Sequence, residues 1–218
     1  LVAGKGYPNP CDYAHVVTST THKVFRSARG GIILSNDVEL GKKFDTAVFP
    51  GYQGGPLMHI IAAKAAGFFE ALKPEFQNYI KNVLSNAKIL AETLKNNGFK
   101  IYSGGTDTHL MLVDLRPFNV KGNLAAESLC RANITCNKNG IPFDTEKPMI
   151  TSGIRLGSQA ATTRGFGLKE FEKVGDLITK VIKGLSDNPD DNSKVEEEVR
   201  NEVINLCSNF PIYKNLNK

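Results

Sequence analysis

Tryptophan is absent from this sequence of 218 residues, and cysteine is scarce. The four cysteines show no Cys-x-x-Cys spacing, and no histidine is placed to complete a zinc set; they are Cys11, Cys130, Cys136 and Cys207. This pattern predicts neither a disulfide framework nor a metal site, and it favours reduced thiols in the cytoplasm. A long apolar run is also missing. Residues 60–72 come nearest, but Lys64 and Glu70 interrupt them, and a membrane span needs about 20 apolar residues. We therefore expect a soluble protein.

The composition has none of the biases that mark disordered, collagen-like or coiled-coil chains, since 41% of the residues are hydrophobic and 22% are charged. A chain of this length can bury a core without disulfide or metal staples. The first ten residues contain neither an initiator methionine nor a charged leader with an apolar stretch. We expect the sequence to begin inside a longer protein.

No long single-sign stripe of charge runs along the chain, although the net charge is +5 from 27 Lys and Arg against 22 Asp and Glu. A pI near 9.0 would suit nucleic-acid binding. Basic and acidic side chains are interleaved instead, as in Lys169, Glu170, Glu172 and Lys173. This pattern is typical of a solvated helix face, so we do not expect nucleic-acid binding as the main role.

Apolar periodicity predicts a mixture of helices and strands. Helices are expected from Pro56 to a break at Pro74, from there to a stop at Gly98, over residues 123–132 and 168–185, and after the polar run 186–193. Strands are expected over residues 15–19, 31–34, 100–103, 109–115 and 153–157, the first two of them buried. This alternation indicates an α/β or α+β chain, and we place a domain boundary near Pro74.

One loop, between the first two predicted strands, concentrates reactive side chains. Residues 17–23 read Val-Thr-Ser-Thr-Thr-His-Lys, and Arg26 and Arg29 follow. A lone lysine in a loop is usually a solvated surface residue. Crowding by cations and desolvation would destabilise the ammonium form of Lys23, and the neutral amine could then form a Schiff base with an aldehyde.

This loop resembles the pyridoxal-phosphate attachment site of the serine hydroxymethyltransferase family, whose members use folate and interconvert serine and glycine. The resemblance begins with Thr18-Ser-Thr-Thr-His-Lys23 and Arg29-Gly-Gly31. Family-like motifs follow in the family's order: Phe49-Pro-Gly-Tyr-Gln-Gly-Gly-Pro-Leu57, Ser103-Gly-Gly-Thr-Asp-Thr-His109, Asn137-Lys-Asn139, Thr151-Ser-Gly-Ile-Arg-Leu-Gly157 and Thr163-Arg-Gly-Phe166. The resemblance therefore covers the whole chain.

The resemblance implies a fold class and a domain division. The chain would be the C-terminal portion of an α/β fold of the aspartate-aminotransferase-like, pyridoxal-phosphate-dependent type. Residues 1–74 would complete the large, cofactor-binding domain, and residues 75–218 would form an α+β small domain. The family's upstream half, with further cofactor ligands and an acid–base glutamate, is missing from the sequence. We therefore expect this chain by itself to be inactive.

At the cofactor, the resemblance implies that Lys23 binds pyridoxal 5′-phosphate covalently. His22 would influence the choice of substrate, although the local hydroxyl groups could equally hold it in a structural role. Arg29 would form a positive wall of the pocket. The family does not require a cation at Arg26, so a place in the pocket wall and a place in solvent are both open for this residue.

The turn at Gln53-Gly54-Gly55-Pro56 precedes a predicted helix. Backbone amides at a helix N-terminus bind anions well, although a Gly-Gly turn is more often purely structural. By resemblance, Gly54 and Gly55 reach the cofactor phosphate of a neighbouring subunit, which implies a homodimer or a dimer of dimers. Tyr52 differs from the small residue that is common there.

A second group of residues is implied to bind the substrates. The guanidinium of Arg155 could grip an amino-acid carboxylate with two hydrogen bonds, and the alternative is a surface ion pair. By resemblance, Arg155 is the carboxylate clamp and Asn139 contacts the pterin ring of folate. Lys147, Pro148 and Met149 would touch the rest of that ligand, although Lys147 and Met149 differ from the usual small and aromatic residues.

The function implied is a glycine hydroxymethyltransferase of one-carbon metabolism, which converts serine and tetrahydrofolate reversibly to glycine and 5,10-methylenetetrahydrofolate. Two alternatives stay open: a pyridoxal-phosphate aminotransferase or lyase that does not use folate, and a non-catalytic dimerisation or RNA-binding fragment. No P-loop, dinucleotide fingerprint, zinc-protease motif or nucleophile elbow competes. The acidic residues Asp144, Glu146 and 196–198 are interpreted as solvated carboxylates.

Overall fold

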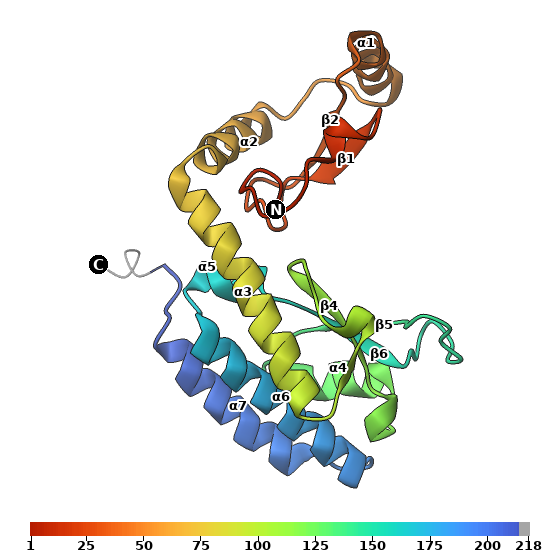
Figure 1. Cartoon of the computed structure of the whole chain (residues 1–218), viewed down its shortest axis with the longest axis vertical. Coiled ribbons are helices and arrows are strands. Elements are labelled where there is room, and N and C mark those ends of the chain that lie inside the picture. Colours follow the sequence, from red (N-terminus) through yellow and green to blue (C-terminus); the bar gives the residue numbers. More distant parts are fainter. Residues whose placement is uncertain (214–218) are drawn as a thin grey trace. The chain divides into compact units, whose positions relative to one another are not determined.

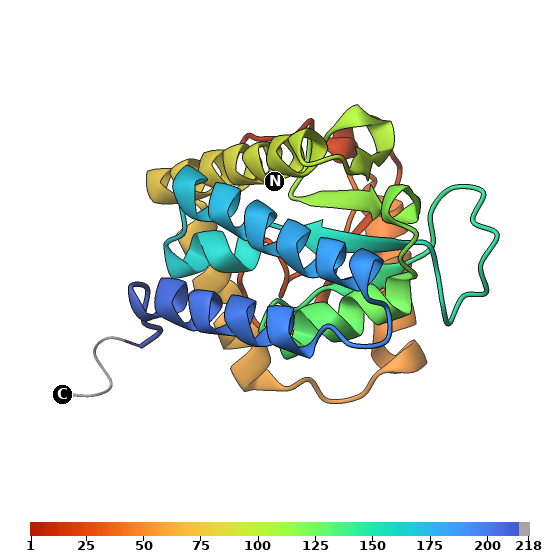
Figure 2. The same cartoon turned by 90° about the horizontal axis from the view of Figure 1, so that it is seen from below.

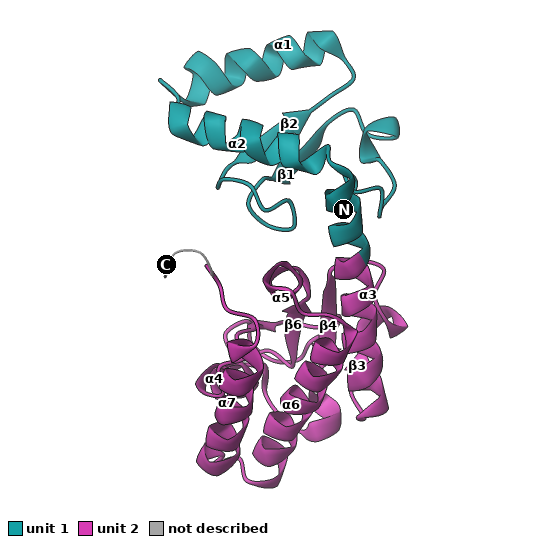
Figure 3. Ribbon diagram, turned by 90° about the vertical axis from the view of Figure 1, so that its left-hand side faces the viewer, with its two compact units in different colours: residues 1–81 teal, residues 82–218 magenta. Residues whose placement is uncertain are grey.

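A computed structural model describes residues 1–213, and the chain divides into two compact units, residues 1–81 and 82–218 (Figure 3). Each unit is described here by itself. Helix α3, Pro74–Asn96, begins in the first unit and continues in the second. Its start at Pro74 fits the proline, which is favourable in the first turn of a helix. The division into domains at residues 74 and 75 stays a prediction about the whole protein.

The first unit contains a two-stranded antiparallel sheet and two helices. Its elements are a 3₁₀ turn at Pro10–Asp12, β1 Val17–Thr20, β2 Gly31–Leu34, α1 Val38–Thr46, a π-helical turn at Ala47–Tyr52 and α2 Met58–Ala71 (Figure 1). Both strands lie where they were predicted, but the expectation that they are buried is wrong for this unit. Ile33 and Leu34 of β2 are 46% and 44% exposed.

The second unit has a four-stranded antiparallel sheet in the order β3-β4-β6-β5 and four further helices. The strands are β3 Lys100–Ile101, β4 Leu110–Asp114, β5 Asn137–Asn139 and β6 Gly153–Gly157. The helices are α4 Gly122–Arg131, α5 Gln159–Arg164, α6 Leu168–Asp187 and α7 Ser193–Ser208. The predicted α/β class is confirmed, whereas β5 and α5 were not predicted.

The core of the second unit lies between the helices and one face of this sheet (Figure 2). Val113 of β4 and Ile154 of β6 are paired across the strands, and both are fully buried. They meet Leu94 of α3 and Ile178 of α6 in one apolar cluster. Side chains alternate along a strand, so the residue after Ile154 points to the opposite, open face. That residue is Arg155, which is exposed.

Two acidic residues that were interpreted as solvated are not. Glu196 is only 3% exposed, and its carboxylate accepts hydrogen bonds from Ser128 Oγ at 2.6 Å and from Arg131 Nε at 2.6 Å. Asp144 accepts bonds from backbone amides and from a serine hydroxyl of its own loop. Both interpretations were wrong: the tertiary fold brings Arg131 to Glu196 from 65 residues away, and Asp144 is bonded within the loop that it closes. None of the helices within the described residues is long and apolar enough to cross a membrane.

Candidate functional site

The loop between β1 and β2 folds back on itself and leaves Lys23 at its tip. Thr21, which is 1% exposed, closes the loop: its backbone N–H donates to Gly30 O at 3.0 Å, and its Oγ1 donates to Ala28 O at 2.5 Å. Arg26 N donates to Lys23 O at 3.0 Å, as in a tight turn. Lys23 is exposed, and no ion pair holds its amine among the residues that the structure describes. The amine is therefore available to a ligand.

His22 lies between two donors. Its Nε2 is 3.3 Å from Arg29 Nη1, and its Nδ1 is 3.4 Å from Gly30 N. A guanidinium and a backbone amide only donate, and a neutral imidazole has one donor and one acceptor nitrogen. Only one of the two contacts is therefore a hydrogen bond at any time. The structure brings His22 and Arg29 together beside the lysine loop.

Arg26 is held by aromatic rings of the first unit. Its guanidinium carbon lies 3.9 Å from the centroid of the Tyr79 ring and 5.8 Å from that of Phe76. Tyr79 in turn donates from its hydroxyl to Val24 O at 3.1 Å. A cation over an aromatic face is attracted to it, so this arrangement gives Arg26 a structural role beside the lysine loop.

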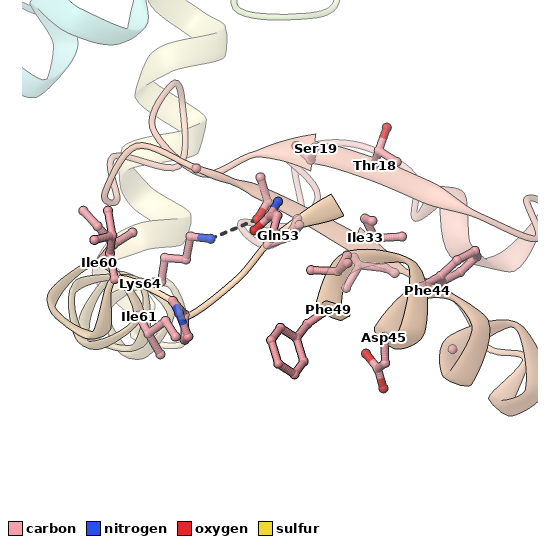
Figure 4. A pocket seen from close by; sticks show the side chains of 18 of the residues that line it. Thr18, Ser19, Ile33, Phe44, Asp45, Phe49, Gln53, Ile60, Ile61 and Lys64 are labelled. Atoms are coloured by element: carbon pink, nitrogen blue, oxygen red, sulfur yellow. Dashed lines mark hydrogen bonds between the residues drawn. The ribbon is translucent and has the colours of Figure 1, made fainter. Parts of the chain in front are cut away.

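An open hollow of about 1120 Å³ lies next to this loop within the first unit (Figure 4). Its lining combines Arg29, the loop residues Gln53 and Pro56, and apolar side chains; the apolar part includes Ile33, Leu34, Phe44, Phe49, Ile60 and Ile61. Lys64 projects from α2 toward β2 and donates to Gly31 O at 3.1 Å. The hollow therefore has two cations, Arg29 and Lys64, and one carboxylate, Asp45, in a wall of apolar and polar side chains. Neither His22 nor Lys23 lines it.

The predicted phosphate turn leads into α2, which begins at Met58. Gly54 and Gly55 are exposed, and a Cβ atom at either position would meet no atom of this chain within 4 Å. Neither has a positive φ, so the local backbone does not require glycine there. The two glycines provide backbone amides that no side chain shields. An anion from outside the chain could bind to such amides.

Arg155 stands on the open face of the second unit's sheet. It is paired with Leu112 of β4 and with Asn137 of β5, and its Nη2 donates to Asn137 Oδ1 at 3.3 Å. No carboxylate pairs with it among the described residues. The strand holds the backbone of Arg155, and apart from the bond to Asn137 its exposed guanidinium is open to a ligand.

The predicted folate residues lie on β5 and in the connection that follows. Asn139 ends β5 opposite Gly153 of β6, and its Nδ2 donates to Gly140 O at 2.8 Å. Lys147, Pro148 and Met149 are exposed in the connection between β5 and β6. The structure thus brings Asn139 and the Arg155 strand into one sheet, with the exposed segment 147–149 in the same hairpin.

Sequence reasoning missed two residues of this arrangement. Asn137 contacts the guanidinium of Arg155, and Lys64 adds a cation to the hollow of the first unit. The repeat in Asn137-Lys-Asn139 could have indicated Asn137, because residues two apart on a strand share a face. For Lys64 no sequence signal was available, since it interrupts an otherwise apolar helix face.

This chain is similar in sequence to proteins of one family. The family model described as serine hydroxymethyltransferase matches residues 1–178. A serine hydroxymethyltransferase of Pelagibacter ubique (strain HTCC1062) is 86% identical over 216 residues, which are 99% of this chain and 50% of that protein. One of Marinomonas sp. (strain MWYL1) is 64% identical over 214 residues, 98% of this chain and 50% of its own. The chain spans about half the length of the curated relatives it matches.

Proposed function

Because this chain belongs to the serine hydroxymethyltransferase family, we propose that it forms the carboxyl-terminal half of an enzyme that converts serine and tetrahydrofolate to glycine and 5,10-methylenetetrahydrofolate. The observation that carries the proposal is the match over residues 1–178, which includes both the lysine loop and the Arg155 strand. Within each unit, the predicted residues have side chains or amides that are open to a ligand.

Lys23, His22, Arg29, Gly54 and Gly55 are the residues that would hold pyridoxal 5′-phosphate. The exposed amine of Lys23 would attach it, and the imidazole and guanidinium beside the loop would face it. The unshielded amides of the two glycines suit its phosphate, in keeping with the empty space at their Cα atoms. When bound, pyridoxal 5′-phosphate supplies an electron sink for negative charge that develops at the α-carbon of an amino acid.

Arg155 would bind the substrate carboxylate. A planar fork on a strand that holds its backbone, with no carboxylate partner among the described residues, matches a carboxylate with two parallel hydrogen bonds. Holding the carboxylate orients the α-carbon, which lowers the entropic cost of reaching the reactive geometry. Asn139 and residues 147–149 would bind tetrahydrofolate from the same hairpin. We further propose a cytoplasmic homodimer, in which Gly54 and Gly55 serve the site of the partner subunit.

The test uses the full-length protein that carries this chain. Borohydride reduction of the holoenzyme, followed by peptide mapping, should attach the cofactor to the peptide with Lys23 and leave Lys43 unmodified. Lys43 is a suitable reference because it is an exposed lysine of α1. Conversion of serine to glycine should require tetrahydrofolate. An adduct on another lysine would contradict the assignment, and folate-independent turnover at the same rate would indicate an aminotransferase or lyase.

A further inference from the structure

The connection between β5 and β6, residues 140–152, has an exposed crest and a base that is held by hydrogen bonds. We call it the β5–β6 loop. It extends beyond the edge of the sheet in Figure 2. Phe143 and Met149 on this crest are 98% and 73% exposed. Large apolar side chains that stand in solvent are typical of a surface that a ligand or another protein covers.

The base of the β5–β6 loop is closed by Asp144. Its Oδ2 accepts from Ile141 N at 3.1 Å and from Ser152 N at 2.9 Å. Its Oδ1 accepts from Glu146 N at 3.0 Å and from Ser152 Oγ at 2.7 Å. One carboxylate therefore joins the first part of the loop, at Ile141, to its last residue, Ser152. Partial burial opposes ionisation of Asp144, but these hydrogen bonds outweigh it and lower the pKa of the carboxyl.

The end of the loop is also fixed from outside. The first amides of α4, Gly122 N and Asn123 N, donate to Thr151 O and Ile150 O, both at 2.9 Å. A Cβ atom on Gly122 would come within 2.6 Å of Gly153 O, so only glycine permits this close approach. Lys121 forms an ion pair with Glu146. The loop is thus attached to α4 on one side and to the Asp144 carboxylate within.

The backbone of the loop is strained at two positions. Phe143 has φ 57° and Thr151 has φ 63°, and neither residue is glycine. Bulky and β-branched residues rarely adopt this left-handed region, and the conformation persists only where the surroundings enforce it. Phe143 precedes Asp144, and Thr151 precedes its partner Ser152. The bonds to Asp144 therefore maintain a shape that the loop would not choose by itself.

We propose that Asp144 is a positioning residue for folate: it holds the β5–β6 loop in the shape that presents residues 147–149 to that ligand. The inference rests on the proposed function, which assigns the folate contact to this segment. Asp144 would act through the loop, because its two oxygens are occupied by donors from the loop itself. Loss of the carboxylate should therefore weaken folate binding and leave the Arg155 clamp in place.

Asp144→Asn in the full-length holoenzyme tests this role. Each carboxylate oxygen of Asp144 accepts from two donors, at least one of which is a backbone N–H. In asparagine one of these oxygens is replaced by an NH₂ group, which cannot accept, so at least one backbone N–H loses its acceptor. We expect the dissociation constant for 5-formyltetrahydrofolate, a stable reduced folate, to rise about tenfold, which corresponds to about 1.4 kcal/mol. The dissociation constant for serine should stay within about twofold, because the register of β6 is unchanged. Amide hydrogen exchange in residues 140–152 should accelerate.

Asp191→Asn is the matched control. Asp191 is exposed, and its Oδ1 accepts from Ser193 N at 3.0 Å, so the same change removes the charge of a locally bonded carboxylate away from the loop, while the amide oxygen can still accept that bond. It should alter neither dissociation constant. Ser152→Ala, which removes only the hydroxyl donor, should raise the folate constant about threefold, and it decides the question if Asp144→Asn does not fold.

The outcomes separate the two proposals. If the parent binds folate and neither loop variant weakens that binding, the role of Asp144 is refuted and the proposed function stands. Equal losses of folate and serine binding would also refute it, because they indicate a general structural effect. If the parent itself binds no folate, the proposed function fails and the role of Asp144 fails with it.

Discussion

Replacement of Arg155 by lysine separates a ligand-binding arginine from a structural one. Lysine keeps the positive charge and most of the length of the side chain, but it loses the planar fork that grips a carboxylate with two hydrogen bonds. Arg155 is exposed, and within the described residues its guanidinium has one hydrogen-bond partner, Asn137, at 3.3 Å between Nη2 and Oδ1. The fold therefore depends little on this guanidinium.

The expected magnitudes follow from these contacts. Loss of one long, exposed hydrogen bond should change the free energy of unfolding by no more than about 0.5 kcal/mol. Loss of a bidentate pair with the substrate carboxylate should cost about 2–4 kcal/mol of binding free energy, or about 30- to 900-fold in the dissociation constant. Binding and stability should thus respond very differently to the same change.

The assay is a spectral titration of the full-length holoenzyme with serine, accompanied by thermal unfolding of each variant. Arg131→Lys is the control, because the Arg131 fork holds the buried carboxylate of Glu196 with bonds of 2.6 and 2.7 Å. It should lower the unfolding temperature and leave serine binding intact. If Arg155→Lys binds serine as tightly as the parent, or loses stability as Arg131→Lys does, Arg155 is structural and the carboxylate ligand lies elsewhere.

Two further predictions concern other parts of the chain. Hydrogen bonding to the Arg131 guanidinium outweighs the effect of burial and lowers the pKa of Glu196 below its usual 4.5. The ionised pair therefore stabilises the fold fully above about pH 4.5, and this stabilisation is lost as the pH falls through the lowered pKa. Glu196→Gln should therefore cost about 1–3 kcal/mol at pH 7 and progressively less below about pH 4.5 in urea unfolding of the full-length protein; an equal difference at all pH values would refute the ionised pair. A dimer of one Gly55→Asp subunit and one Lys23→Ala subunit should regain cofactor binding at one of its two sites if the turn serves its partner; mixed dimers that bind no more than either variant alone would exclude shared sites.

The sequence predicted the long helices well because their apolar faces repeat along the chain. In α6, Phe171, Leu177, Ile178 and Ile182 recur at helical spacing, and all of them lie in the core. Short elements gave no such signal. The strand β5 has no apolar residue, since it reads Asn-Lys-Asn. Its place at the sheet edge follows from pairing with β6, which local periodicity does not encode.

The candidate site was predictable where a motif is local and was missed where partners are distant. Lys23 and Arg155 were identified from motifs of a few residues around each. Glu196 was misjudged because its partner Arg131 lies 65 residues away in sequence, so a charged run on a helix looked like a solvated face. The exposure of β1 and β2 was missed for a related reason: β-branched composition predicts strands, but it does not say whether another element covers them.

Buried and exposed side chains alternate along β6, so the exposed residue 155 can be substituted without changing the core. Ile154 and Leu156 secure the strand in the core, while the side chain of Arg155 between them donates to Asn137 at the surface. A different side chain at residue 155 would therefore meet the same rigid backbone and the same neighbours on β4 and β5. The scaffold could be redesigned to select another functional group, such as an amide in place of a carboxylate, without repacking the apolar residues that keep it folded.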